Sequence, residues 1–145
     1  MKKILFILIL LLIPNSIWAT PDTPDYQDIS NQATILYAGN DIKNSLELFL
    51  SIPEDKRTTQ NWLLLGNIMQ DQGKNDEAVF MYKKAIQLDE KFYKAYYNLG
   101  NIYLKDSKPN MAIEQYKKVI KLKPEYAYAH YNLACAYIKL GKYSK

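Results

Sequence analysis

From residue 59 onward, apolar and polar positions repeat along the chain with a period of 34 residues. The segment Leu65–Ile68, LGNI, returns as Leu99–Ile102, and the segment Tyr82–Leu88, YKKAIQL, returns as YKKVIKL over Tyr116–Leu122. Two blocks that share one offset indicate an internal repeat, each unit having room for two helices and a turn. The pattern predicts helical hairpins over 59–92 and 93–126, and the first helix of a third unit over 127–145.

Small residues stand where the paired helices of each unit are expected to cross closely. Gly66, Gly100 and Ala134 occupy this place on the first helices, and Ala78 and Ala112 occupy it on the second helices. Large aromatic side chains then fill the space around each crossing. The expected core is therefore built from tightly crossed helix pairs.

Turn residues predict where these helices begin and end. Gly73 and Gly141 are expected to end first helices in a left-handed conformation. Ser107 is expected to cap the next helix, in which Pro109 takes an early position, and Pro124 ends that helix.

These features together resemble the tetratricopeptide repeat, whose consensus has an aromatic residue, Leu-Gly and Tyr on the first helix, then Ala, an aromatic residue and Pro. The unit 93–126 carries Tyr96, Leu99-Gly100, Tyr103, Ala112, Tyr116 and Pro124. The unit 59–92 follows the same pattern, except that Glu90 replaces the proline. The resemblance implies an all-α, right-handed superhelical stack of antiparallel hairpins, which acts as a non-catalytic binding scaffold.

Residues 26–58 fit the repeat only with a one-residue slip, and Ser45 stands where alanine is expected. We interpret this segment as a degenerate repeat or capping hairpin, with one helix around 29–38 and another around 42–51 that Pro53 ends. Residues 20–25 contain two prolines and two aspartates and are expected to form a flexible leader.

The resemblance places the binding site in the groove lined by the first helices. Of the groove positions, the following are the candidate peptide-binding residues: Leu63, Asn67, Lys94, Tyr97, Asn98, Asn101, Tyr128 and Tyr131. Tyrosine rings and asparagine amides suit a protein or an extended, neutral peptide segment. The alternative is that the asparagines only satisfy neighbouring backbone groups.

One subclass of the family clamps the terminal carboxylate of chaperones with two asparagines and three basic residues. Asn67 and Asn98 occupy the asparagine places, but Leu63, Tyr128 and Asn132 occupy the cationic ones. Without these charges a terminal carboxylate has no partner, so we expect a different ligand.

Catalytic chemistry has little support in the sequence. The histidine His130 stands at a consensus aromatic position and is expected to pack, and Cys135 points to another face of the same helix. Neither zinc-ligand spacing nor a glycine-rich phosphate loop is present. We therefore expect neither enzymatic activity nor a cofactor or metal site.

The N-terminus has the pattern of an export signal: Lys2 and Lys3, the apolar run Ile4–Ile13, and a cleavage site after Ala19. The sequence predicts a signal peptide over 1–19 and a periplasmic or secreted protein of a bacterial envelope. Because Ile17 departs from the small-residue rule, an uncleaved segment that anchors an assembly factor to the membrane is the alternative.

Charge argues against nucleic acid as a partner. Residues 59–145 hold fourteen basic and eight acidic side chains, but the lysines stand mainly in pairs at equivalent places of each unit, as on solvated helix faces. The incomplete third unit has an expected uncovered apolar side, formed by Leu133, Tyr137, Leu140 and Tyr143. It indicates a lone capping helix, self-association through 127–145, or the N-terminal fragment of a longer repeat array.

Overall fold

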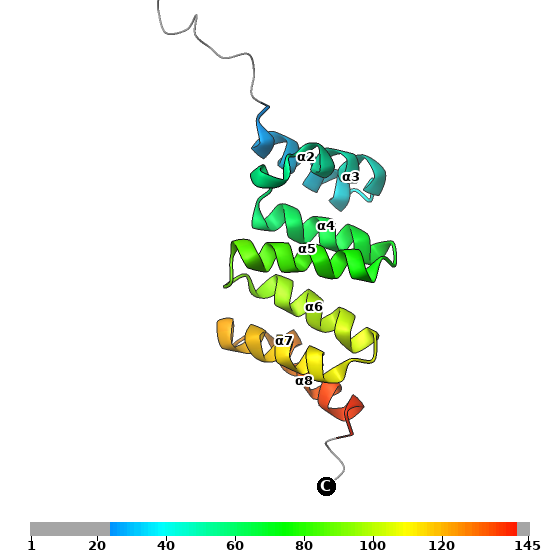
Figure 1. The fold of residues 1–145 in the computed structure, drawn as a ribbon, viewed down its shortest axis with the longest axis vertical. Helices are drawn as coiled ribbons and strands as arrows, with labels where there is room; N and C mark the ends of the chain where they lie inside the picture. Colours follow the sequence, from blue (N-terminus) through cyan, green and yellow to red (C-terminus); the bar gives the residue numbers. More distant parts are fainter. Residues whose placement is uncertain (1–23, 142–145) are drawn as a thin grey trace, which may run out of the picture.

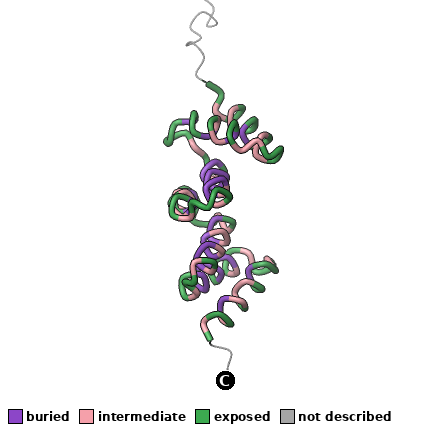
Figure 2. The backbone as a smooth tube through the Cα atoms, turned by 90° about the vertical axis from the view of Figure 1, so that its right-hand side faces the viewer, coloured by how far each residue is buried: buried purple, intermediate pink, exposed green. Residues whose placement is uncertain are grey.

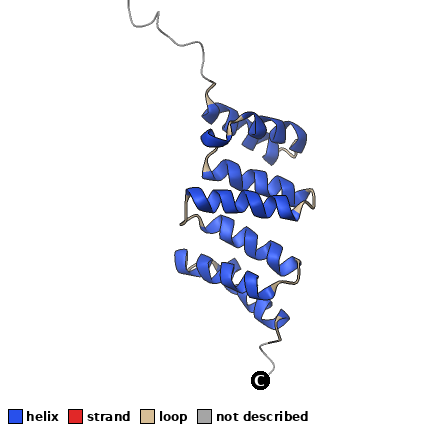
Figure 3. Ribbon diagram, viewed as in Figure 1, coloured by secondary structure: helices blue, strands red, loops and turns tan. Residues whose placement is uncertain are grey.

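The computed structural model describes residues 24–141, and all regular structure within this range is helical (Figure 3). The helices are α2 (Tyr26–Ala38), α3 (Ile42–Ser51), the short 3-10 helix η3 (Glu54–Lys56), α4 (Thr59–Asp71), α5 (Asn75–Leu88), α6 (Tyr93–Lys105), α7 (Pro109–Leu122) and α8 (Ala127–Lys139). They follow one another along a single long axis (Figure 1). None of these helices is long and apolar enough to cross a membrane.

The helices pair as antiparallel hairpins, α2 with α3, α4 with α5 and α6 with α7, and α8 packs on α7. Each second helix also contacts the first helix of the next hairpin. Buried positions run through the middle of the stack, as Figure 2 shows. The predicted all-α stack of helical hairpins is confirmed.

The chain reverses after each first helix through one residue in the left-handed region. These residues are Asn40, Gly73, Ser107 and Gly141, with φ of 64°, 74°, 58° and 70°. Gly73 and Gly141 fill the predicted role, since glycine adopts this conformation without steric cost. Asn40 stands 33 rather than 34 residues before Gly73, which locates the one-residue slip of the first unit.

Two predicted helix starts are corrected. Ser107 does not cap α7: it takes the left-handed position of the turn, and Lys108 is the capping residue before Pro109. Helix α2 begins at Tyr26, three residues before its expected start, because the Asp25 carboxylate accepts hydrogen bonds from the amides of Gln27 and Asp28. The remainder of the predicted leader, residues 20–23, lies outside the described residues.

Glycine allows the closest crossings in the stack. A Cβ on Gly100 would lie 2.5 Å from Cε1 of Tyr116, and a Cβ on Gly66 would overlap the ring of Tyr82 in the same way. Both rings are fully buried. The missing side chain lets each ring lie flat on the first helix and carries its hydroxyl to the next residue, an asparagine.

Candidate functional site

Helices α4 and α6 and the start of α8 form a surface that we call the groove. Its main feature is a hollow of about 340 Å³, lined by Gln60, Leu63, Leu64, Asn67, Lys94, Tyr97, Asn98 and Tyr126. Five of the eight candidate residues meet here: Leu63, Asn67, Lys94, Tyr97 and Asn98. The groove predicted from the family positions therefore coincides with a real depression between α4 and α6.

A hydrogen-bonded triad forms the floor of this hollow. The Tyr82 hydroxyl donates to Asn67 Oδ1 at 2.8 Å, with Gln70 Oε1 at the same distance. Asn98 Nδ2, from the next hairpin, donates to the same Asn67 oxygen at 2.8 Å. Burial raises the pKa of Tyr82 above its ordinary value, so its hydroxyl remains a donor under physiological conditions.

The same triad recurs one unit further along the stack. The Tyr116 hydroxyl donates to Asn101 Oδ1 at 2.8 Å, and Asn132 Nδ2 donates to that oxygen at 2.9 Å. Asn132 Nδ2 also donates to the Tyr97 hydroxyl at 3.1 Å. The asparagines therefore do bond locally, but to side chains of the neighbouring unit rather than to the backbone groups that the alternative interpretation named.

Three comparisons place these features among known proteins. A TPR-repeat family model matches residues 66–107, and tetratricopeptide-repeat models match residues 93–126 and 115–145. This chain is a tetratricopeptide-repeat (TPR) protein. Repeats of this family typically bind proteins or peptides and are generally non-catalytic scaffolds.

Solved structures share the fold of this TPR protein at low sequence identity. Two crystal structures of MamA match with TM-scores of 0.70 and 0.75 at 23% and 21% identity. They cover 81% and 83% of this chain, which spans 64% and 71% of theirs. The first TPR of Spaghetti (RPAP3), bound to the HSP90 peptide SRMEEVD, matches with a TM-score of 0.75 at 16% identity, covering 83% of this chain and 96% of its own. A search of curated proteins finds no significant match.

Tyr126 is the groove residue of this TPR protein that the family positions do not include. Its ring lies 5.2 Å from those of Tyr93 and Tyr97, nearly perpendicular to Tyr97, and 5.7 Å from that of Tyr128. It precedes α8, at the position that Phe92 and Thr58 occupy in the two earlier units. The 34-residue offset marks this position, but the change from threonine to tyrosine hides its role.

The other three candidate residues lie beyond the hollow. Tyr128 and Tyr131 are on α8, 66% and 70% exposed, and Tyr128 reaches the groove only through its ring contact with Tyr126. Asn101 belongs to the floor of the next unit. These residues extend the groove toward α8 and do not line the hollow.

Two expectations about α8 are corrected. His130 is exposed rather than packed, with Nε2 2.7 Å from the Pro124 carbonyl oxygen. Leu133, Tyr137 and Leu140 are partly buried against the core rather than uncovered, because α8 leans on α7; Tyr143 lies outside the described residues. Within residues 24–141, no three His, Cys, Asp or Glu side chains are grouped so as to hold a metal ion.

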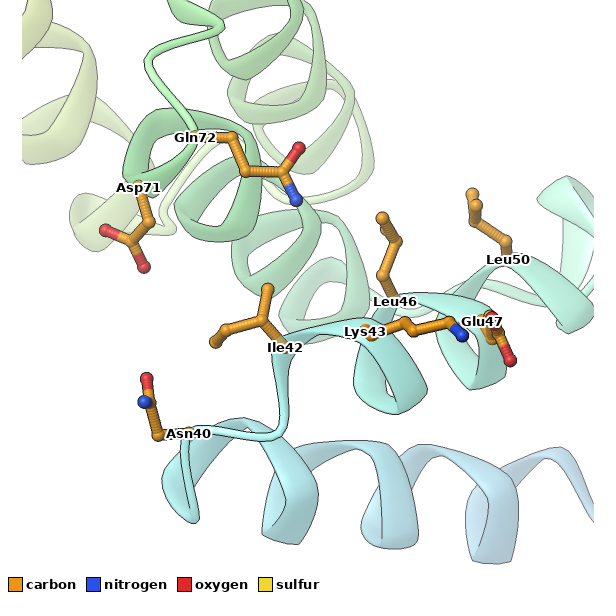
Figure 4. Close-up of a pocket in the computed structure, with 8 residues that line it drawn as sticks. All are labelled: Asn40, Ile42, Lys43, Leu46, Glu47, Leu50, Asp71 and Gln72. Atoms are coloured by element: carbon orange, nitrogen blue, oxygen red, sulfur yellow. The ribbon is translucent and has the colours of Figure 1, made fainter.

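A larger hollow, of about 680 Å³, lies outside the groove (Figure 4). Ile42, Leu46 and Leu50 project from one side of α3 toward the end of α4, where Asp71 and Gln72 form the opposite wall. Size alone does not favour it, since it lacks the aromatic rings and the amide triad that distinguish the groove.

Proposed function

We propose that this TPR protein is a non-catalytic scaffold that binds an extended protein segment in the groove. The observation that carries the proposal is the combination of a rigid floor with free hydrogen-bonding groups. Asn67 Oδ1 is fixed by two donors, whereas its Nδ2 has no acceptor among the described residues. Fixed donors of this kind bind ligand carbonyls with little loss of side-chain entropy.

The charge of the groove supports a ligand different from an acidic chaperone tail. Lys94 is the one charged residue that lines the hollow. Leu63, Tyr128 and Asn132 stand where carboxylate-clamping relatives carry cations. A segment without a required terminal carboxylate fits this surface better than a peptide such as the one bound by Spaghetti.

The test is affinity capture with the full chain as bait, read out by mass spectrometry. The groove variant combines Lys94→Ala with Tyr97→Ala, which spares the asparagine triad around Tyr82. The matched control combines Phe80→Ala with Lys83→Ala on α5, away from the groove. We expect partners to be retained by the control and lost by the groove variant, with unchanged thermal unfolding in both. Equal retention by the two variants would place the binding site elsewhere.

We further propose that the protein is exported, on the basis of the sequence of residues 1–19, which lie outside the described residues. The basic start at Lys2 and Lys3 and the apolar run Ile4–Ile13 support this proposal. Expression of the full chain in a bacterium, followed by intact-mass measurement, tests it. Loss of residues 1–19 and recovery from the envelope fraction are expected; an uncut chain in the membrane fraction would favour the anchored alternative, and an uncut soluble chain would contradict export.

A further inference from the structure

The free groups of the hollow are mostly hydrogen-bond donors. The Tyr97 oxygen accepts from Asn132 Nδ2, and its own proton has no acceptor among the described residues. Asn67 Nδ2 and the Lys94 ammonium add further donors. Free acceptors are fewer, chiefly the amide oxygens of Gln60 and Asn98, and no carboxylate lines the hollow. A ligand that offers carbonyl oxygens and few N–H groups satisfies this set.

The apolar part of the hollow is a corner between two aromatic rings. The Tyr97 and Tyr126 rings meet at 89° with centroids 5.2 Å apart, and Leu63 and Leu64 lie beside them. The Tyr128 ring, 5.7 Å from Tyr126, continues the aromatic surface onto α8. Such a corner receives a compact aliphatic ring on both of its faces, since aromatic side chains offer large apolar contact area at low entropy cost.

Proline meets both requirements at once. It supplies a backbone carbonyl but no N–H, and its pyrrolidine ring is a compact apolar group. In a polyproline II helix the backbone carbonyls make no internal hydrogen bonds and stay available to donors, and the extended form is already ordered before binding. Aromatic-lined grooves that recognise proline-rich segments use this combination in unrelated folds.

We propose that the segment bound in the groove is proline-rich and adopts a polyproline II conformation. The inference rests on the proposed function and specifies the chemistry of its ligand. Proline rings pack into the corner between Tyr97 and Tyr126, and the peptide carbonyls accept from the Tyr97 hydroxyl and from Asn67 Nδ2. An acidic segment would use Lys94 and the donors but would leave the corner between the rings unfilled.

The experiment is isothermal titration calorimetry of the full chain with three capped ten-residue peptides. The first is all proline, the second has alanine at every other position, and the third has glutamate at every other position. We expect the all-proline peptide to bind at least about tenfold more tightly than the alanine peptide, which loses both the rings and the pre-ordered backbone. Equal or tighter binding of the alanine or glutamate peptide would overturn the inference, as would no binding of any.

Two variants connect binding to the corner. Tyr97→Phe keeps the ring and removes the donor, so binding of the all-proline peptide should weaken about three- to tenfold. Phe80→Ala, on α5, should leave it unchanged. Full affinity in Tyr97→Phe would remove the hydroxyl from the recognition scheme and contradict the inference. If partner capture depends on the groove while the all-proline peptide does not bind, the proposed function stands and only the proline inference fails.

Discussion

The two junctions on either side of the α4–α5 hairpin solve the same packing problem with different chemistry. At the second junction, Asn67, Tyr82 and Asn98 join α4, α5 and α6 through hydrogen bonds in the middle of the crossing. At the first junction the equivalent positions hold Thr34, Phe49 and Leu64. Phe49 is fully buried and has no hydroxyl, and the Thr34 hydroxyl donates back to the Ser30 carbonyl within α2.

Polar contacts do cross the first junction, but they lie at its ends. Asn61 Nδ2 donates to Ser30 Oγ near the start of α4, and the Tyr37 hydroxyl donates to Asp71 Oδ2 at 2.8 Å near its end. Burial, reinforced by Asp71, raises the pKa of Tyr37 to about 12. The comparison teaches that the stack does not require a central triad. Where the triad is present, it fixes side chains under the hollow, which links it to the groove.

The largest effect is expected where the backbone of a first helix meets a tyrosine ring. Gly100→Ala should lower the free energy of unfolding by about 2–3 kcal/mol, because the new Cβ would lie 2.5 Å from a fully buried ring that has no room to retreat. The shift of the Tyr116 ring would also break its bond to Asn101. Denaturant unfolding followed by circular dichroism measures the change.

Gly39→Ala is the matched control, since a Cβ there would make only ordinary contacts, the nearest at 3.4 Å to the Ile35 carbonyl oxygen. Its effect should stay within about 0.5 kcal/mol. Similar effects at Gly39 and Gly100 would mean that the tyrosine does not lie against α6 as described.

The next effect tests whether the two junction chemistries are interchangeable. Asn67→Thr should cost about 1–2 kcal/mol, because Asn98 Nδ2 loses its acceptor and the Tyr82 hydroxyl keeps only Gln70. The triple variant Asn67→Thr, Tyr82→Phe and Asn98→Leu reproduces the first junction. It should cost less than the sum of the three single changes by about 1 kcal/mol or more, since it removes donors together with their acceptor.

Thermal and denaturant unfolding of the three single variants and the triple variant provide the data. Strict additivity would show that the three side chains do not act as one hydrogen-bonded unit. A triple variant less stable than the sum would show that the second junction cannot accept the apolar chemistry of the first.

The repeat made most of this fold predictable, because its period and small-to-large pairing depend on residues close in sequence. The hairpins over 59–92 and 93–126 follow directly from Gly66, Gly100 and their partner tyrosines. The turn at Ser107 was mistaken for a cap because serine favours helix N-caps, whereas the fold needs a left-handed residue at that place. Only the position equivalent to Gly73 and Gly141 identifies it.

The site was predictable only as far as the family positions reach. They located Leu63, Asn67, Lys94, Tyr97 and Asn98, which do line the hollow. They could not give the bonds between Asn67, Tyr82 and Asn98, which join three helices and two repeat units. Nor could they give the ring contacts of Tyr126, a residue that stands outside the first helix and acts through tertiary packing.

The smallest expected effect concerns the one small residue of the first hairpin that departs from alanine. Ser45 is fully buried, and its hydroxyl donates to the Ala33 carbonyl at 2.7 Å. That carbonyl lies inside α2 and already accepts a helical hydrogen bond. Ser45→Ala should therefore change the free energy of unfolding by no more than about 0.5 kcal/mol, since the lost bond is offset by the better helix propensity of alanine.

The matched control is Ser30→Ala, at the other buried serine of this hairpin. The Ser30 hydroxyl accepts from Asn61 Nδ2, and Asn61 is 1% exposed. Its removal leaves a buried amide donor without an acceptor, which should cost about 1 kcal/mol or more. Both variants are measured by denaturant unfolding. A larger loss for Ser45→Ala than for Ser30→Ala would mean that the first hairpin depends on its own serine bond more than on its bond to α4, and the slipped unit would then be a self-supporting cap rather than a member of the stack.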